Sequence, residues 1–270
     1  MTNVDAISIA EAYNASSRRL LLFDYDGTLS PFENDPAAAR PSKEVIDTLE
    51  RLESDRCNDV VLISGRAAAE LDSFFGSPSF LLVAEHGGFY KSPYGTWKQT
   101  FMINPDWVDQ VSKSVTALTF QHEGSLMERK HFSVAWHYRS IASSLSDHHH
   151  DQILEAIRSL PEHGKFIIDD GQYTMELRTP LVEKGAFVSW WCRRDYDFTM
   201  AIGDGVTDED MFRALSPGGF TIRVGKWRQS HARYHLERQQ DVLPFLQNLL
   251  TVNKEFEQLR HSIGLDNGPS

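Results

Sequence analysis

The chain has 270 residues with 38 acidic and 27 basic side chains, which gives a formal net charge of −11 at pH 7. This length suits one large domain or a core with a modest insertion. The negative charge argues against nucleic acid as the main partner, because phosphate backbones are held by clusters of Lys and Arg. The two cysteines form no CxxC pair, and no apolar run approaches the roughly 18 residues of a membrane span. We therefore expect a globular, cytoplasmic protein with neither a membrane nor a nucleic acid as partner.

Four short apolar runs, each ending at a polar or glycine-rich turn, predict buried strands at Leu20–Phe23, Val60–Ile63, Phe80–Val83 and Met200–Ile202. The runs are continuous rather than alternating, which is typical of parallel strands buried on both faces. Helical patterns lie between them, and one begins after a predicted N-cap at Ser42. This order predicts an α/β protein with a Rossmann-like parallel-sheet core, whose ligands bind at the carboxyl ends of the strands.

The middle of the chain has a different pattern, which predicts an α+β cap domain over residues 104–180. Its expected elements are a helix over 107–118, an alternating strand over 132–138, a helix over 153–160, and strands over 165–168 and 173–177 around a turn at 169–171. The cap is inserted between two halves of the core, residues 1–103 and 181–252. A polar tail is expected over residues 253–270.

Two carboxylates follow the first predicted strand, at Asp24 and Asp26. Side chains two residues apart face the same way in an extended chain, so both would point into one space. They repel unless a cation or a proton lies between them, which suits a Mg²⁺ site with one acid/base residue. A β-turn with solubilising acids is the alternative interpretation.

Polar residues also follow the second and fourth strands. Ser64, Gly65 and Arg66 combine a hydroxyl, a flexible backbone and a helix N-terminus, which suits phosphate oxygens, although an ordinary N-cap has the same pattern. Asp204 follows the fourth strand, where a metal ligand would lie; a capped helix start is the alternative. Lys184 precedes a helix and, by itself, fits a surface lysine equally well.

Together these segments resemble the haloacid dehalogenase-like phosphohydrolases with a type-II cap. The matching segments are Asp-x-Asp-Gly-Thr at 24–28, Ser-Gly-Arg at 64–66, Lys-Gly at 184–185 and Gly-Asp-x-x-x-Asp at 203–208. The resemblance implies that Asp24 attacks phosphorus and that Asp26 is the general acid/base. It also implies that Ser64 and Lys184 hold the phosphoryl oxygens, beside Gly65 and Arg66.

The same resemblance implies a Mg²⁺ ion bound by Asp24, the Asp26 carbonyl and Asp204, with Asp208 orienting a metal-bound water. This agrees with the chemistry, because a carboxylate that attacks an anionic phosphate needs the phosphate charge neutralised. Mg²⁺ and Lys184 would supply that positive charge while holding the reactants in line.

Within the superfamily, the segments 24–31, 85–88 and 203–212 and the cap segments 128–130, 137–139 and 176–178 are similar to trehalose-6-phosphate phosphatases. In that family, cap residues contact sugar hydroxyls. The resemblance implies that Glu128, Lys130 and Glu176 make these contacts here and that His137 and Arg139 support them. Gly205 departs from the pattern, since a second Asp commonly stands there.

Carboxylates that hydrogen-bond hydroxyls and aromatic faces that pack on sugar C–H groups are an independent reason to expect a sugar. The cap sequence offers Trp136 and Tyr138 as such aromatic faces. The alternative is a salt-bridged, exposed strand with Trp136 in the cap core.

The resemblance thus implies a Mg²⁺-dependent phosphatase acting on trehalose 6-phosphate through an aspartyl-phosphate intermediate, with a cognate sugar-phosphate synthase as a candidate partner. Three alternatives stay open. The substrate is another glycosyl phosphate, such as mannosyl-3-phosphoglycerate or sucrose 6-phosphate; the enzyme is a phosphotransferase or mutase with Asp24 as phosphate carrier; or the chain is a regulatory sugar-phosphate-binding domain with little activity.

Overall fold

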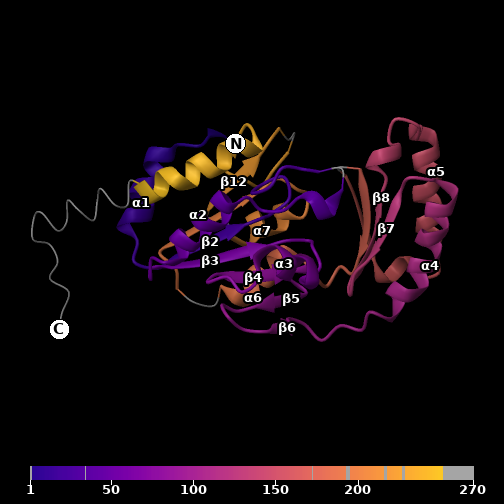
Figure 1. Cartoon of the computed structure of the whole chain (residues 1–270), viewed down its shortest axis with the longest axis horizontal. Coiled ribbons are helices and arrows are strands. Elements are labelled where there is room, and N and C mark those ends of the chain that lie inside the picture. Colours follow the sequence, from indigo (N-terminus) through magenta and orange to yellow (C-terminus); the bar gives the residue numbers. More distant parts are fainter. Residues whose placement is uncertain are drawn as a thin grey trace, which may run out of the picture.

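The structure is a computed structural model that describes residues 2–33, 35–171, 173–192, 195–215, 218–226 and 229–251. The predicted polar tail, residues 253–270, lies outside these ranges. A larger core and a smaller cap lie next to each other, and the chain crosses from the core to the cap and back again (Figure 1).

The core is built on one sheet with the strand order β1-β13-β12-β11-β2-β3-β4-β5-β6 among the described residues. The strands from β1 to β4 in this order pair in parallel, and the antiparallel hairpin of β5 and β6 extends one edge. The bounds are β1 Thr2–Asn3, β13 Tyr234–Leu236, β12 Phe220–Val224, β11 Phe198–Gly203, β2 Arg19–Phe23, β3 Asn58–Ile63, β4 Leu81–Ala84, β5 Phe89–Lys91 and β6 Trp97–Gln99. The four predicted strands are β2, β3, β4 and β11, at the centre of the sheet.

Helices cover both faces of the core sheet, which confirms the predicted α/β class. On β2, Leu21 and Phe23 pack against one layer, whereas Leu20 and Leu22 pack against the other, so a strand buried on both faces needs a continuous apolar run. The first layer contains α1 (Ala6–Ala15), α2 (Lys43–Glu53), α3 (Ala68–Phe75) and a helix over residues 242–251; the second contains α6 (Lys184–Trp191) and α7 (Asp208–Leu215). Ser42 caps α2 as predicted, because its side chain accepts from the Val45 N–H.

The cap is an antiparallel sheet of order β7-β8-β10-β9, with α4 and α5 on the side away from the core (Figure 1). Its elements are α4 Asp106–Gln121, β7 Leu126–Arg129, β8 Ser133–His137, α5 Asp147–Arg158, β9 Ile167–Gly171 and β10 Thr174–Arg178. Short 3-10 helices complete the fold: η1 Pro36–Ala38, η2 Glu85–Gly87, η3 Arg139–Ile141, η4 His163–Lys165 and η5 Gln239–Asp241.

Two details of the cap differ from the sequence prediction. The turn expected at residues 169–171 belongs to β9, where Asp169 pairs with Glu176 across the sheet, and Lys165 lies in η4 instead of a strand. β7 was not predicted at all. β7 and β9 both carry polar residues and have only one face covered by helices, so neither shows a strong apolar pattern.

The elements of the cap run from Asp106 to Arg178, and the core resumes with α6 at Lys184. The domain boundaries at 103/104 and 180/181 stay predictions. No helix in the described part of the chain has both the length and the apolar character needed to cross a bilayer.

Candidate active site

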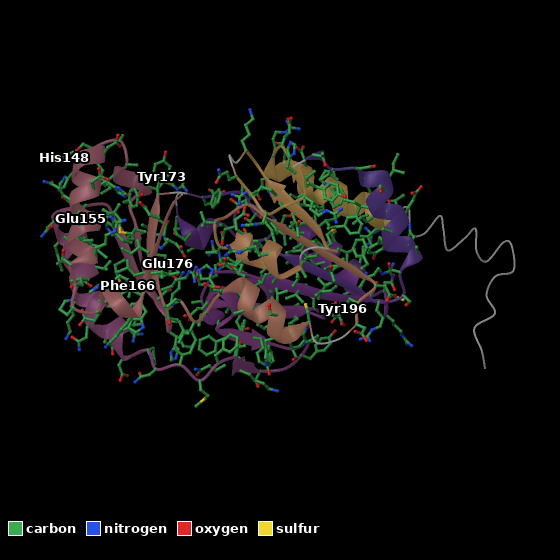
Figure 2. All side chains as sticks on the ribbon, turned by 180° about the vertical axis from the view of Figure 1, so that it is seen from behind. His148, Glu155, Phe166, Tyr173, Glu176 and Tyr196 are labelled. Carbon is green, nitrogen blue, oxygen red and sulfur yellow. The ribbon has the colours of Figure 1, made fainter. Side chains whose placement is uncertain are left out.

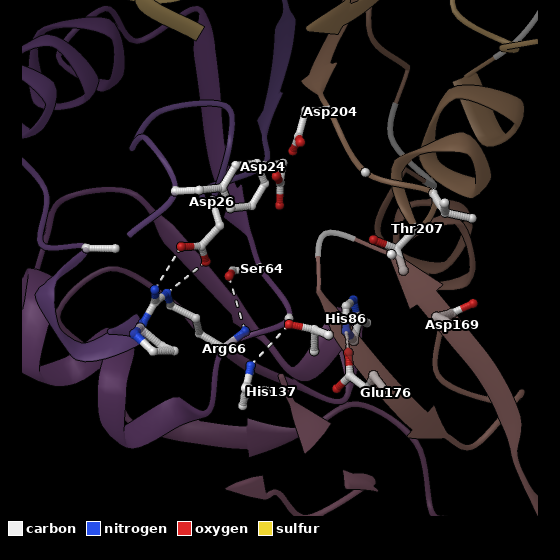
Figure 3. A pocket seen from close by; sticks show the side chains of 18 of the residues that line it. Asp24, Asp26, Ser64, Arg66, His86, His137, Asp169, Glu176, Asp204 and Thr207 are labelled. Carbon is white, nitrogen blue, oxygen red and sulfur yellow. Dashed lines mark hydrogen bonds and ion pairs between the residues drawn. The ribbon is translucent and has the colours of Figure 1, made fainter. Parts of the chain in front are cut away.

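A pocket of about 270 Å³ lies between the carboxyl ends of the core strands and the cap (Figure 3). All of the predicted site residues line it: Asp24, Asp26, Ser64, Gly65, Arg66, Glu128, Lys130, His137, Arg139, Glu176, Lys184, Asp204 and Asp208. The structure therefore brings together residues that are up to 184 positions apart in the chain. Their individual roles are the subject of the proposal below.

The floor of the pocket holds three carboxylates. β2 and β11 are adjacent, with Phe23 opposite Ile202, so Asp24 and Asp204 leave the sheet side by side. Gly27 has a φ of +77°, and a Cβ at this position would lie 2.4 Å from Asp204 Oδ2, so only glycine allows this close approach. Carboxylate oxygens of Asp24, Asp204 and Asp208 lie within 4.8 Å of one another, and all three residues are buried.

Lys184 lies among these acids at the start of α6. Its Nζ is 2.5 Å from Asp24 Oδ1 and 2.7 Å from Asp208 Oδ1. A Cβ on the next residue, Gly185, would lie 2.4 Å from the Asp210 carbonyl oxygen. The glycine thus lets α6 pack tightly on α7, and this packing sets the buried ammonium against Asp208.

Lys184 balances only part of the negative charge of the three floor carboxylates. Burial raises the pKa of Asp24 to about 7; the negative charge of Asp208 adds to the effect, and Lys184 offsets part of it. Burial, followed by the charge of Asp24, raises the pKa of Asp204 well above its usual value. Carboxylate oxygens are the ligands that Mg²⁺ prefers, and a divalent cation would relieve this repulsion. The donor set therefore fits Mg²⁺.

The Asp26 carboxylate points toward Arg66 and pairs with it (Figure 3). Arg66 Nε lies 2.8 Å from Asp26 Oδ2, and Arg66 Nη2 lies 2.7 Å from Oδ1, which is a bidentate geometry. The remaining guanidinium nitrogen, Nη1, contacts Glu70 at 2.8 Å. Arg66 is predicted to contact the substrate, and in the structure it also fixes the orientation of the Asp26 carboxylate.

Ser64 follows β3 at the same edge of the sheet and is 1% exposed. Its Oγ accepts a hydrogen bond of 3.1 Å from the Arg66 N–H. Because the oxygen acts as acceptor in this bond, the hydroxyl hydrogen remains available to a phosphoryl oxygen in the pocket.

The roof of the pocket is a charged network on the cap. Lys130 Nζ lies 3.1 Å from Glu176 Oε1 and 3.8 Å from Glu128 Oε2, and it donates to the Gly65 carbonyl of the core at 2.9 Å. His137 Nε2 lies 3.0 Å from Glu128 Oε2. The Lys130 and Glu176 side chains are 7% and 12% exposed. Burial alone would raise the pKa of Glu176, but Lys130 and then His86 hold it well below its usual value.

Two core residues in this network, Glu85 and His86, were not named as site residues from the sequence. His86 Nε2 lies 3.0 Å from Glu176 Oε2, and Glu85 Oε2 accepts from the Phe132 N–H of the cap at 2.8 Å. Both have positive φ values, 47° and 56°, a conformation that non-glycine residues rarely adopt. In the sequence, Glu85 and His86 come directly after the buried strand β4 and are followed by two glycines. This glycine pair is the sequence signal that points to the turn.

Trp136 and Tyr138, the aromatic residues expected to face a sugar, do not line the pocket. Trp136 is fully buried in the cap core, where its Nε1 donates to Ser125 Oγ at 2.9 Å, and Tyr138 is only 8% exposed. Trp136 therefore lies in the cap core, as the alternative interpretation expected, although its strand β8 is buried and not exposed. The aromatic side chains that line the pocket are Phe32 and Tyr173. Gly205, the departure from the family pattern, donates its N–H to Asp208 Oδ2 at 2.7 Å.

Comparison with known proteins gives consistent matches over most of the chain. The family model "Trehalose-phosphatase" matches residues 22–240. The trehalose-phosphatase of Zygosaccharomyces rouxii is 36% identical over 233 residues, which are 77% of this chain and 26% of that protein. A bifunctional trehalose-6-phosphate synthase/phosphatase of Thermoproteus tenax is 30% identical over 83% of this chain and 31% of its own length. The chain thus spans about a quarter to a third of the curated relatives that it matches.

Among solved structures, the C-terminal domain of the Candida albicans trehalose-6-phosphate phosphatase matches with a TM-score of 0.86. Its sequence is 29% identical, and the match covers 93% of this chain and 98% of that one. The similarity therefore includes both the core and the cap. From the family match, the relatives and this structural agreement, the chain belongs to the trehalose-phosphatase family.

Proposed function

We propose that the chain is a Mg²⁺-dependent phosphatase that hydrolyses trehalose 6-phosphate to trehalose and inorganic phosphate. The observation that carries this proposal is one pocket with two chemically different ends. Its floor holds Asp24, Asp204 and the buried Lys184, and its roof holds Lys130 and Glu176. Anionic phosphate suits the floor, where Lys184 and a bound Mg²⁺ would supply positive charge, and hydroxyls suit the roof. Membership of the family supports the reaction class and the sugar.

Mg²⁺ would be held by Asp24, Asp204 and the Asp26 carbonyl, and when bound it would neutralise charge on the phosphoryl group. An Asp24 carboxylate oxygen attacks phosphorus, and the bond between phosphorus and the sugar oxygen breaks. Asp26 gives its proton to the departing sugar oxygen, which leaves as a hydroxyl. Asp26 later takes a proton from the water that attacks phosphorus, and the bond between phosphorus and Asp24 breaks to release phosphate.

The other residues of the floor position the reacting groups. The Lys184 ammonium and the Ser64 hydroxyl hold the phosphoryl oxygens, and the bidentate pair with Arg66 fixes the direction of the Asp26 carboxylate. Asp208 holds Lys184 from the opposite side and orients a water. Preorganised charges of this kind lower the barrier without having to reorganise during the reaction.

The roof recognises the sugar. Glu176, Lys130 and Glu128 now satisfy one another, and sugar hydroxyls can replace part of these contacts without leaving a charge unpaired. His137 holds Glu128 in place. Since Lys130 also donates to the core carbonyl of Gly65, the same residues that contact the sugar keep the cap over the site.

Phosphate release over a panel of sugar phosphates tests the proposal. We expect trehalose 6-phosphate to have a kcat/KM at least tenfold above that of sucrose 6-phosphate, mannosyl-3-phosphoglycerate and glucose 6-phosphate. A faster reaction with another member of the panel would replace the substrate. Binding without turnover in Mg²⁺ would indicate a regulatory domain, and transfer to a sugar acceptor would indicate a phosphotransferase.

We also propose a cytoplasmic location and a synthase that supplies the substrate. The bifunctional synthase/phosphatase among the relatives supports such a pairing of activities. Co-purification of the endogenous protein with a synthase, and cell fractionation, test these two points. Recovery in a membrane fraction would contradict the first, and recovery without any synthase would contradict the second.

A further inference from the structure

Arg223 is a buried arginine beside the floor of the pocket. It belongs to β12, where it lies opposite Gly203 of β11 in the parallel pair, and Asp204 is the residue after Gly203. Only 2% of Arg223 is exposed. Burying a guanidinium is costly unless its donors have partners, so the contacts of this side chain indicate what it does.

A single nitrogen of Arg223 makes two contacts. Arg223 Nη1 donates to the carbonyl oxygen of Gly205 at 2.8 Å and to Oε1 of Glu209 at 2.8 Å. Glu209 also accepts from Ser230 Oγ at 2.8 Å and from the His231 N–H at 2.7 Å. The Arg223–Glu209 pair thus ties the loop after β11 to the first turn of α7 and to the segment before β13.

The loop over residues 204–208 carries two of the three floor carboxylates, Asp204 and Asp208. Gly205 donates its N–H to Asp208 Oδ2 at 2.7 Å, and its carbonyl accepts from Arg223. The peptide groups on both sides of Gly205 are therefore held, one by Asp208 and one by Arg223. Since a glycine backbone is otherwise the most flexible, these two contacts restrict where the loop can lie.

The same loop has open space on two sides. Asp204 and Thr207 line the phosphate pocket (Figure 3). Val206, which is 48% exposed, lines both this pocket and a second one of about 460 Å³, which Glu209 also lines. A segment with cavities on both sides has fewer packing contacts to hold it, so its hydrogen bonds carry more of the restraint.

We propose that Arg223 is a positioning residue that raises the affinity of the floor for Mg²⁺. By holding the Gly205 carbonyl and Glu209, it fixes the loop that carries the floor carboxylates. Arg223 does not line the phosphate pocket, so it acts through this loop. The inference rests on the proposed function for the identity of the ion.

Positioning and simple electrostatics predict opposite effects of removing this guanidinium. A positive charge near the floor repels a cation, so its removal would by itself tighten the binding of Mg²⁺. Loss of the restraint on the loop would instead weaken binding, since groups that orient metal ligands typically account for roughly 10- to 100-fold in metal affinity. The direction of the change therefore decides between the two effects.

Calorimetric titration with Mg²⁺ in the absence of substrate measures this direction. Arg223→Met keeps an unbranched side chain but has no donor, and we expect its Kd for Mg²⁺ to be at least tenfold above that of the unmutated chain. Arg223→Lys should stay within about threefold, because both contacts come from one nitrogen, which an ammonium can replace. A double variant with Arg223→Met and Glu209→Gln leaves no unpaired carboxylate. It should show the same loss, and it replaces Arg223→Met if that variant does not fold.

Arg19→Met is the matched control. Arg19 is also a buried arginine, 3% exposed, but it lies at the start of β2, whereas Asp24 follows the end of that strand. It too donates to a backbone carbonyl and to a carboxylate, those of Tyr13 and Asp55. We expect Arg19→Met to lower the melting temperature, as Arg223→Met does, but to leave the Kd for Mg²⁺ within about twofold of the unmutated chain.

Hydrolysis of a small aryl phosphate gives a second readout. In Arg223→Met the Mg²⁺ concentration that gives half of the maximal rate should rise in parallel with the Kd. The kcat at saturating Mg²⁺ should change by less than about threefold, since excess ion fills the weakened site.

Unchanged or tighter Mg²⁺ binding by Arg223→Met, or an equal weakening by Arg19→Met, would overturn the assignment of Arg223. Turnover of trehalose 6-phosphate by the unmutated chain is measured separately. Its absence would refute the proposed function while the Mg²⁺ affinities still decide on Arg223, so the two failures are distinguishable. A lack of Mg²⁺ binding by the unmutated chain would overturn both.

Discussion

Replacing Glu176 by Gln separates recognition of the sugar from the phosphate chemistry. The Glu176 carboxylate accepts from Ser133 Oγ at 2.6 Å and from Lys130 Nζ at 3.1 Å, and it lies 3.0 Å from His86 Nε2. Gln has almost the same shape, but it removes the negative charge and turns an NH₂ group toward one of these partners. Figure 2 shows Glu176 between the cap sheet and the core, away from the helices of the cap.

A hydrogen bond to a charged group is worth about 1.5–3 kcal/mol, and the substitution weakens the contacts to Lys130 and His86. We therefore expect a loss of about 2–3 kcal/mol in transition-state binding, or roughly a 30- to 150-fold fall in kcat/KM for trehalose 6-phosphate. A small aryl phosphate reaches Asp24 without these contacts, so its kcat/KM should fall by less than about threefold. Phosphate release with both substrates measures the difference.

Glu155→Gln is the matched control, because Glu155 lies on α5 of the same cap with its side chain 72% exposed. It should change neither substrate. Equal losses on both substrates in Glu176→Gln would mean that the change damages the fold or the closure of the cap. Undiminished activity on the sugar phosphate would refute the assignment of the roof to the sugar.

Three further predictions concern the floor, the core and the turn below the cap. Exhaustive chelation should abolish turnover and Mg²⁺ should restore it, since the buried floor carboxylates repel one another; full activity without metal would contradict this. Burial raises the pKa of Glu53 to about 7, so the folded state holds this proton more tightly than the unfolded chain does, and the resulting stabilisation is lost as the pH rises from about 4.5 through 7. Glu53→Gln should therefore be more stable than the wild type by about 1–2 kcal/mol at pH 8, allowing for its partial exposure, and equally stable near pH 5. Urea unfolding measures the free energy of unfolding of both proteins, and a difference that does not change with pH would contradict the reasoning. In Gly65→Ala the new Cβ would lie 2.5 Å from the His86 ring and would displace it from Glu176. Activity on the sugar phosphate should therefore fall about tenfold with an unchanged circular dichroism spectrum. Wild-type activity would show that His86 does not act on Glu176.

The central strands and the floor of the site were predictable because both follow from local pattern. Leu20–Phe23 and Val60–Ile63 are continuous apolar runs, and the residues after such runs must meet at one edge of a parallel sheet. Asp24 and Ser64 could thus be placed near each other without knowledge of the loops. The short edge strands β1 and β6 have too few residues to show any period.

The contacts between core and cap were not predictable from local pattern. The His86–Glu176 pair joins residues 90 positions apart, and the Lys130–Gly65 pair joins residues 65 apart. Each depends on how two separately folded sheets meet. For the same reason Trp136, on an alternating strand, was a candidate for a sugar contact, although its face of the strand is covered by α4 and α5.

The most direct test of the central claim is phosphate release from trehalose 6-phosphate in Mg²⁺ by the wild type and by Asp24→Asn. Asn is nearly isosteric with Asp but cannot form the acyl phosphate, so the variant should keep its melting temperature and lose several orders of magnitude in kcat. Turnover by Asp24→Asn near the wild-type rate would contradict the assignment of Asp24 as the nucleophile, and with it the proposed mechanism.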